Sequence, residues 1–253
     1  DSFPAGFLLG ARVQDVAIIG HAADGSIQLE AACACKGDRL EIVTGMEAPL
    51  VGAHLLTRTP LAANLPPIDL RLATTRGTNA LLEKRGAAVA LFVTEGFGDL
   101  LRIGDQTRPD LFALDIQKPE PLHEVVVEVP GRLSARGVEL SPLAIDEIIG
   151  KAKIVLERGV EVACVALLHS DLNPEMEQNL AECLIQLGFR DVVTSSAVSA
   201  RVHFGHRAET ALVDAYLLPI MDAYLNHVQS GLGDAARLRV MTSAGGLVER
   251  GQF

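Results

Sequence analysis

The sequence predicts an α/β fold with a mixed sheet in which strands and helices alternate. Short apolar runs typical of buried strands alternate with helical patterns along most of the 253 residues, which favours a largely parallel sheet. An N-terminal hairpin pattern adds antiparallel strands, so the sheet is expected to be mixed. The content of 49% hydrophobic and 21% charged residues is typical of a globular protein with one large or two modest domains.

The N-terminal third contains the hairpin pattern and one strand–helix pair. Residues 7–19 are apolar, Asp24 and Gly25 form a turn signal, and alternation resumes over residues 27–33, which predicts a β-hairpin. Residues 49–56 fit a short helix. A strand over 68–73 and a helix over 79–85 follow.

The rest of the chain repeats the alternation. A continuous apolar strand, a short helix and a long polar loop precede the next strand, and loops of that length are often functional. Ser141 and Pro142 are expected to open a helix, with proline at its first position. Gly188 is expected to end the later helix over residues 173–187. The predicted strands are 89–94, 125–129, 162–168, 192–195 and 238–242; the predicted helices are 99–103, 141–158, 173–187 and 208–228, and the loop is 105–121.

Charge and composition exclude several classes of function. The net charge of −10 argues against nucleic acid and against an anionic membrane as the main partner. The sequence has no apolar run of membrane-spanning length and no basic N-terminal region typical of a signal peptide, so a cytoplasmic location is expected. The four cysteines lack zinc-site spacing and are expected to be reduced thiols: Cys33, Cys35, Cys164 and Cys183.

The segment at residues 74–79 is the most informative. Thr74, Thr75, Thr78 and Asn79 crowd the expected start of a helix, where free backbone N–H groups and the helix dipole favour an anion. An ordinary N-cap is the simpler interpretation, but one threonine is enough for a cap. The surplus of polar groups leaves room for a ligand.

Two further segments could bind anions. Ser243, Gly245 and Gly246 follow a strand, where glycine backbone can approach a phosphate closely, although a lone Gly-Gly pair is more often a tight turn. Arg102 and Arg108 lie near the long loop and could grip a carboxylate or phosphate. A solvated loop with surface ion pairs is an equally good interpretation of the arginines.

The histidines are interpreted as structural. His169 ends a buried strand, and local hydrogen bonds are the favoured explanation. His203 and His206 lie three residues apart with no third ligand in view, so no metal site is predicted. Glu209 and Asp214 are expected on a helix surface.

Taken together, these segments resemble the hydantoinase A/5-oxoprolinase family. The likeness runs from about residue 40 to the end, and several ordered motifs are more specific than any one alone. The main motifs are TTRGTNALLEKRG (74–86), VTEGFGDLLRIG (93–104), RPDLF (108–112), KPEPL (118–122), ALLHS (166–170), DAYL (214–217) and MTSAGGL (241–247).

The resemblance implies an incomplete actin-like/sugar-kinase ATPase (ribonuclease H-like) fold, with an N-terminal domain over 1–198 and the start of an ATPase domain over 199–253. Such proteins use ATP and Mg²⁺ to activate the carbonyl of a cyclic amide before the ring is hydrolysed; relatives carboxylate ketones. It implies a hydantoinase B-type subunit or domain as partner, and an oligomer. The residues carried over are Thr74, Thr75, Thr78, Asn79, Ser243, Gly245, Gly246 and Gly10 for nucleotide phosphate, and Arg102, Arg108 and Asp99 for substrate or domain contact.

The chain departs from the family near its start. The family usually opens with a strand and a glycine–threonine phosphate loop, and here Leu8, Ala11 and Arg12 stand where an acidic residue, a glycine and a threonine are usual. A non-catalytic scaffold with a degenerate loop is therefore one alternative, and a ketone carboxylase subunit is another. The ending just after a Gly-Gly turn is expected to be a cut inside a larger protein.

Overall fold

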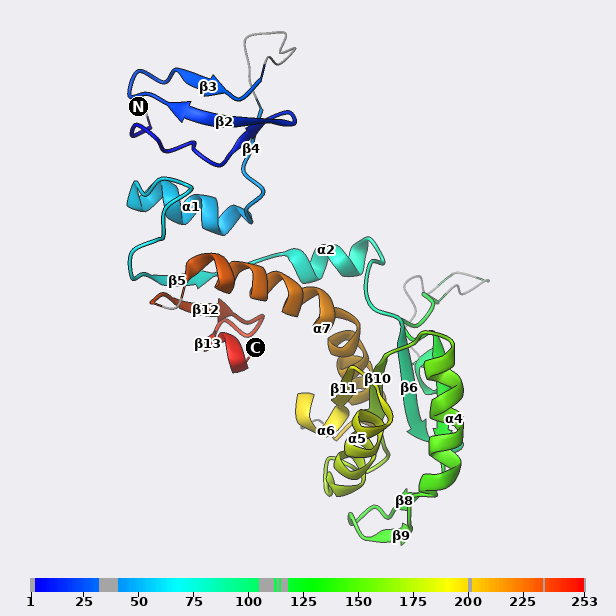
Figure 1. The fold of residues 1–253 in the computed structure, drawn as a ribbon. Coiled ribbons are helices and arrows are strands. Elements are labelled where there is room, and N and C mark those ends of the chain that lie inside the picture. The colour runs from blue at the N-terminus through cyan, green and yellow to red at the C-terminus, as the bar shows by residue number, and fades with distance from the viewer. Residues whose placement is uncertain are drawn as a thin grey trace. The chain divides into compact units, whose positions relative to one another are not determined.

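A computed structural model describes residues 3–31, 41–104, 112, 114, 118–199, 202–233 and 235–252. Contacts between Cα atoms divide the chain into two compact units. The terminal unit is built from two segments, Asp1–Thr75 and Asp222–Phe253, coloured blue to cyan and orange to red in Figure 1. The central unit is the continuous segment Arg76–Met221.

The central unit is built on a parallel four-stranded sheet with strand order β11-β10-β6-β7. Its strands are β6 (Val89–Thr94), β7 (Val125–Val129), β10 (Val162–Ala166) and β11 (Asp191–Thr194). Every residue of β6 and β10 is buried, as expected for strands covered on both faces. All four strands are confirmed within one or two residues.

Helices cover both faces of this sheet. Ala90 and Phe92 of β6 pack with α4 (Ile145–Glu157) and α5 (Glu175–Leu187). Leu91 of β6 faces the other way, in a cluster with the first half of α7 (Phe204–Leu232). This alternation follows from the period of two in a strand.

The terminal unit holds two smaller sheets. The predicted hairpin is confirmed as β2 (Val16–His21) and β3 (Ile27–Leu29), but it does not join the parallel strands. It forms an antiparallel sheet of its own with β1 (Arg12–Val13) and β4 (Ile42–Val43), because short strands close together in sequence pair with one another first.

The mixed sheet is a second, three-stranded one of order β13-β12-β5. Its central strand β12 (Arg237–Met241) pairs in parallel with β5 (Asp69–Leu72) and antiparallel with β13 (Leu247–Glu249). The helix α1 (Ala48–Thr57) and the second half of α7 contribute Leu50 and Val228 to the core of this unit.

Three predicted helix starts are wrong by three or four residues, that of α7 among them. The helix α2 (Arg76–Leu82) begins three residues before the predicted start, so Thr78 and Asn79 lie inside it. The helix α4 begins only at Ile145, because Ser141 ends the strand β9 (Glu139–Ser141), which pairs with β8 (Arg132–Leu133). Pairing with a strand therefore takes precedence over the Ser-Pro helix signal.

Other helices follow the sequence more closely. The helix α5 ends at Gly188, whose φ of 119° is a left-handed conformation that suits glycine. The short helix α3 (Leu100–Ile103) is confirmed, and α6 (Ser195–Val198) and the 3₁₀ helix η1 (Arg250–Gln252) were not predicted.

The long helix α7 extends four residues beyond both predicted ends. On its predicted apolar face Leu212, Tyr216 and Val228 are buried, so internal packing is confirmed for these three; Pro219 and Ile220 are half-buried, and Ala223 is exposed. In the described part of the chain, no helix has the length and apolar character needed to cross a membrane.

Candidate functional site

Two sequence motifs that are about 170 residues apart meet at one edge of the mixed sheet. Leu72 of β5 lies opposite Val240 of β12 in a parallel register. The chain therefore leaves both strands at the same edge, through Thr74 and Thr75 after β5 and through the turn at 242–246 after β12. Ligands of α/β proteins collect at the carboxyl ends of parallel strands.

The turn after β12 is a tight connection to β13. The amide of Thr242 donates to the carbonyl of Gly246 at 2.9 Å, and the amide of Gly245 donates to the carbonyl of Thr242 at 3.0 Å. Gly245 has a φ of 84°, which requires glycine, and a Cβ there would meet no atom within 4 Å. Ser243 and Gly246 are exposed. The turn interpretation is thus confirmed, and the turn leaves its surface open.

The polar residues around the start of α2 keep free hydrogen-bonding groups. Thr75, Thr78 and Asn79 are exposed, and within the described residues their side chains make no hydrogen bond. Thr74 is half-buried and has a polar contact. Of this group, Thr74 and Thr75 lie in the terminal unit, whereas Thr78 and Asn79 lie in the central unit.

The N-terminal segment proposed to correspond to a phosphate loop is a series of turns over residues 5–10, followed by β1. Leu8 and Ala11 are buried in an apolar cluster with Phe7 and Val13. Gly10 is exposed and takes a φ of 88°. The residues that depart from the family pattern at Leu8 and Ala11 therefore have a packing role here.

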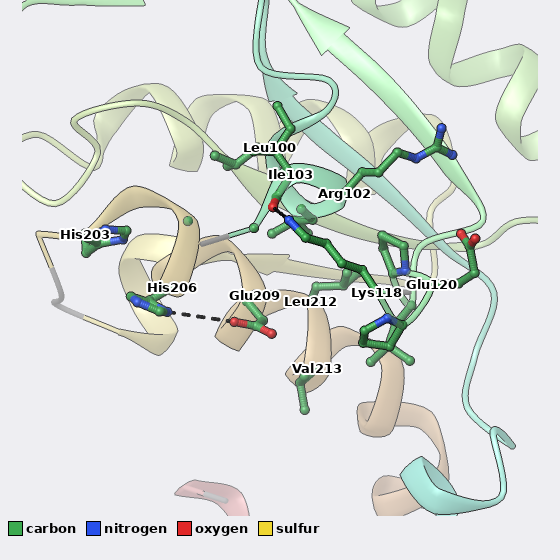
Figure 2. Close-up of a pocket in the computed structure, with 16 residues that line it drawn as sticks. Leu100, Arg102, Ile103, Lys118, Glu120, His203, His206, Glu209, Leu212 and Val213 are labelled. Atoms are coloured by element: carbon green, nitrogen blue, oxygen red, sulfur yellow. Dashed lines mark hydrogen bonds and ion pairs between the residues drawn. The ribbon is translucent and has the colours of Figure 1, made fainter. Parts of the chain in front are cut away.

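The central unit contains a pocket of about 610 Å³, a volume typical of small-molecule sites. It is formed by α3, residues 118–122 and the first half of α7 (Figure 2). Its walls are mostly apolar, with Leu100, Leu122 and Leu212 among them.

Six side chains bring charge or hydrogen-bonding capacity to this pocket: Arg102, Lys118, Glu120, His203, His206 and Glu209. The ammonium of Lys118 donates a hydrogen bond to the carbonyl of Ile103. The rings of His203 and His206 are 4.5 Å apart, and Nδ1 of His206 lies 3.9 Å from a carboxylate oxygen of Glu209.

The predicted contact residues Asp99, Arg102 and Arg108 have different outcomes. Arg102 lines the pocket, and its charge acts with burial, the larger cause, to hold the pKa of His123 below its usual value. Asp99 directly precedes α3 and is exposed. Arg108 lies outside the described residues, as do Cys33 and Cys35.

A buried polar network lies at the carboxyl end of the parallel sheet, and no sequence pattern predicted it. The side chain of Glu177 on α5 accepts hydrogen bonds at one oxygen from the Leu167 amide (2.7 Å) and the hydroxyls of Ser170 (2.8 Å) and Ser195 (2.6 Å). The other oxygen accepts from the amide (2.8 Å) and hydroxyl (2.6 Å) of Ser196. Five donors stabilise a carboxylate that is fully buried.

Arg207 of α7 completes this network from the opposite side. Its guanidinium donates to Ser195 Oγ (3.0 Å), Ser170 Oγ (3.1 Å) and the Leu167 carbonyl (2.8 Å), and pairs with Asp171 at 2.9 Å. Arg207 is fully buried. Since His206 and Glu209 flank it on α7, the network fixes the helix turn that forms one wall of the pocket.

Two residues considered from the sequence take structural roles. His169 adopts a φ of 65°, and its carbonyl accepts from the amides of Leu172 and Asn173, whereas its ring forms no hydrogen bond with the described residues, so the predicted local hydrogen bonds involve its backbone alone. Burial, assisted by the charge of Glu177, raises the pKa of the Cys164 thiol, which keeps it protonated. Among the described residues no three His, Cys, Asp or Glu side chains form a group able to hold a metal ion.

Sequence patterns missed Glu177, Arg207 and Lys118 as individual residues. Single charged residues in amphipathic helices are usually solvated, so the pattern gives no reason to place Glu177 or Arg207 inside. Lys118 was noted only as part of the KPEPL motif, and its place in a pocket depends on α7, about 90 residues later in the chain.

Comparison with known proteins finds two family models that match successive segments of the chain. A family model described as the hydantoinase/oxoprolinase N-terminal region matches residues 57–188, and one described as hydantoinase/oxoprolinase matches residues 207–253. The 5-oxoprolinase of Saccharomyces cerevisiae is 33% identical over 245 residues, and 5-oxoprolinase 1 of Arabidopsis thaliana is 36% identical over 238 residues. Each match covers 82% of this chain but only 19% of the relative.

Two solved structures are similar in fold. The ATP-dependent caprolactamase from Pseudomonas jessenii superposes with a TM-score of 0.66 and 25% identity, covering 92% of this chain and 34% of that one. Nucleotide-free acetone carboxylase has a TM-score of 0.64 and 20% identity, covering 71% of this chain and 28% of that one, and shows the fold alone. With the first family model covering more than half of its residues, the chain belongs to the hydantoinase/oxoprolinase family.

Proposed function

We propose that this chain is the N-terminal part of an ATP-dependent enzyme that hydrolyses a cyclic amide, of the 5-oxoprolinase or hydantoinase type. The observation that carries the proposal is the pair of family matches in chain order, together with two 5-oxoprolinases that are similar along 82% of the chain. The chain spans 19% of their length, so the complete activity would need the rest of such a protein.

The chemistry explains why ATP is used. An unstrained lactam resists attack by water. Transfer of a phosphoryl group from ATP to its carbonyl oxygen activates the carbon, so that one water can add to it and the ring C–N bond can break, with the nitrogen taking up a proton. A second water can then hydrolyse the resulting acyl phosphate and release phosphate. Such catalysis relies on positioning and on electrostatic stabilisation of phosphate charge.

The edge of β5 and β12 is the proposed phosphate site. Thr74, Thr75, Ser243, Gly245 and Gly246 lie there, and the exposed hydroxyls of Thr75 and Ser243 are suitable donors to phosphate oxygens. Thr78, Asn79 and Gly10 are proposed as further contacts. These donors fit a polyphosphate, and Mg²⁺ would then be bound chiefly through the phosphates, as is usual for this ion.

Calorimetry with Mg·ATP tests this assignment. We expect a longer polypeptide, extended past Phe253 to the length of the relatives, to bind Mg·ATP more tightly than the present chain. The double substitution Thr75→Val and Thr78→Val should weaken binding by roughly tenfold, the effect of one or two lost hydrogen bonds to a charged group. Thr210→Val, at an exposed helical threonine of α7, is the matched control.

Failure of the folded longer protein to bind Mg·ATP would exclude the ATPase assignment and favour the scaffold alternative that Leu8, Ala11 and Arg12 suggested. The triple substitution Leu8→Asp, Ala11→Gly and Arg12→Thr tests the hypothesis that the chain is a scaffold with a degenerate phosphate loop. Because Leu8 and Ala11 are buried, we expect this change to destabilise the terminal unit rather than to create a nucleotide site.

A ketone carboxylase subunit is the second candidate. The acetophenone carboxylase gamma subunit of Aromatoleum aromaticum is 32% identical over 170 residues, covering 60% of this chain. Lactam-dependent release of phosphate by the full-length protein would support the hydrolase, whereas release that needs both a ketone and bicarbonate would support the carboxylase.

The assembly and domain boundaries are also proposals. We propose a hydantoinase B-type subunit or domain as partner, and an oligomeric enzyme, because one relative is named as a gamma subunit. The proposed domains remain 1–198 and 199–253, the second being the start of an actin-like ATPase domain. A cytoplasmic location remains a prediction from the sequence alone.

A further inference from the structure

The pocket of the central unit combines mostly apolar walls with a lysine that forms no ion pair with any described residue. Within the described residues, neither Lys118 nor Arg102 has a carboxylate partner. The Lys118 ammonium donates one hydrogen bond to the Ile103 carbonyl, which leaves two of its three donors available. Figure 2 shows Lys118 reaching across to Ile103, while Arg102 extends away from it.

We propose that this pocket binds a small organic carboxylate with an apolar body. The carboxylate would accept hydrogen bonds from the Lys118 ammonium, and the body would pack against Leu100, Leu122 and Leu212. Because Lys118 is exposed, solvent competes for its donors, and the apolar walls must supply the rest of the binding energy. The inference does not depend on the proposed phosphate site, which involves other residues.

The two carboxylates of the pocket form no ion pair with Lys118. Glu209 lies beside His206, 3.9 Å from its Nδ1, on α7. Glu120 lines the pocket two residues after Lys118, and its carboxylate forms no ion pair with Lys118. Glu120 and Glu209 are therefore the negative groups of the pocket, and neither lies within ion-pair distance of Lys118.

Three probes of the same size and different charge test the proposal: benzoate, benzamide and benzylamine. Binding to the full chain can be followed by ligand-detected NMR and by calorimetry. We expect saturable binding of benzoate, at least tenfold weaker binding of benzamide, and still weaker binding of benzylamine. Lys118→Gln should weaken benzoate binding by roughly tenfold or more, which is the effect of losing one charge-assisted hydrogen bond.

Two variants in the pocket, Lys118→Gln and Gly205→Leu, are each compared with a control variant elsewhere in the central unit. Lys153→Gln removes an exposed lysine of α4 and should leave benzoate binding unchanged. Gly205→Leu should block the pocket, because a Cβ at Gly205 fits without a clash beside Leu100 and His203, and the larger side chain would fill the space there. Gly150→Leu, at an open position of α4, is its control.

The proposal is overturned if benzoate shows no saturable binding, or if benzamide or benzylamine binds as well as benzoate. It is also overturned if benzoate affinity survives both Lys118→Gln and Gly205→Leu. Benzoate binding that is lost in these two variants but not in Lys153→Gln or Gly150→Leu would establish the site, whether or not the protein binds Mg·ATP.

Discussion

At the scale of single residues, the fully buried Arg207 illustrates how charge is tolerated in an apolar interior. Its guanidinium has hydrogen-bond acceptors on Ser195, Ser170 and Leu167 and a counter-charge on Asp171. Burial of a charge is costly, and removal of only one partner leaves the others unpaired. The stability of the central unit should therefore depend strongly on keeping this network whole.

Arg207→Met is expected to destabilise the protein by about 3–5 kcal/mol, because Asp171 would lose its counter-charge and the hydroxyls of Ser170 and Ser195 would each lose a donor. Urea unfolding followed by far-UV circular dichroism measures the change. Arg190→Met, which removes surface ion pairs to Glu161 and Asp191, is the control and should cost less than about 1 kcal/mol. Equal effects of the two substitutions would contradict the structural role given to Arg207.

His123 gives the molecule a predictable response to acid. Burial and the charge of Arg102 lower its pKa in the folded protein, despite the nearby Glu120. Above the usual histidine pKa of about 6.5, both folded and unfolded states hold the ring neutral and stability is unaffected. As the pH falls below that value, the unfolded chain binds a proton that the folded chain resists, so stability is lost until the folded pKa is passed.

The free energy of unfolding should thus decrease as the pH falls from about 7 to about 5, and His123→Gln should make this decrease smaller. Urea titrations of both proteins across this range measure the two slopes. Identical slopes would show that other groups control the response.

At the scale of elements, the close packing of α7 explains a glycine at the end of the TTRGTNALLEKRG motif. A Cβ on Gly86 would lie 1.9 Å from the ring of Tyr216, and the amide of the next residue, Ala87, donates to the Tyr216 carbonyl. The ring is buried and cannot move aside freely. Any side chain at residue 86 must therefore displace α7 or the chain before β6.

We expect Gly86→Ala to lower the free energy of unfolding by about 1–3 kcal/mol through overpacking. Gly150→Ala is a matched change at an open helical position and should be neutral or stabilise by up to about 1 kcal/mol. Chemical denaturation of both variants makes the comparison. A Gly86→Ala protein as stable as Gly150→Ala would show that Tyr216 relaxes without cost.

The elements that sequence patterns predict best are those whose environment is uniform along their length. The strand β6 is buried on both faces, so its apolar run gave its boundaries, and α5 has both an asparagine before it and a glycine after it. The predicted start of α4 is wrong because the Ser141–Pro142 signal carries no information about the pairing of β9 with β8.

The candidate site divides in the same way. The motifs around Thr75 and Gly245 were visible as local patterns, but their meeting at one sheet edge depends on the pairing of β5 with β12, which no local pattern predicts. The pocket depends on α3, residues 118–122 and α7 coming together. Long-range contacts of this kind are the part that sequence reasoning could not supply.

At the scale of the whole chain, the two units differ in how their sequence is arranged. The central unit is one continuous segment, and its parallel sheet with both covering apolar clusters is made entirely from residues within it. The terminal unit needs both ends of the chain, since β5 pairs with β12 and Leu50 packs with Val228. Only the central unit therefore has its whole apolar core in one continuous segment of the chain.

A polypeptide of residues 76–221 should therefore fold by itself, whereas residues 1–75 should not. The first keeps all four strands of its sheet and the Arg207 network, and we expect a cooperative thermal transition and dispersed NMR amide signals. The second keeps the small apolar cluster around Phe7 but loses β12 and the α7 residues that cover Leu50, so the apolar faces of α1 and β5 lose most of the surface they pack against. If 76–221 shows only broad, uncooperative melting, stability of the central unit must come from the terminal one; if 1–75 folds alone, β12 is dispensable to it.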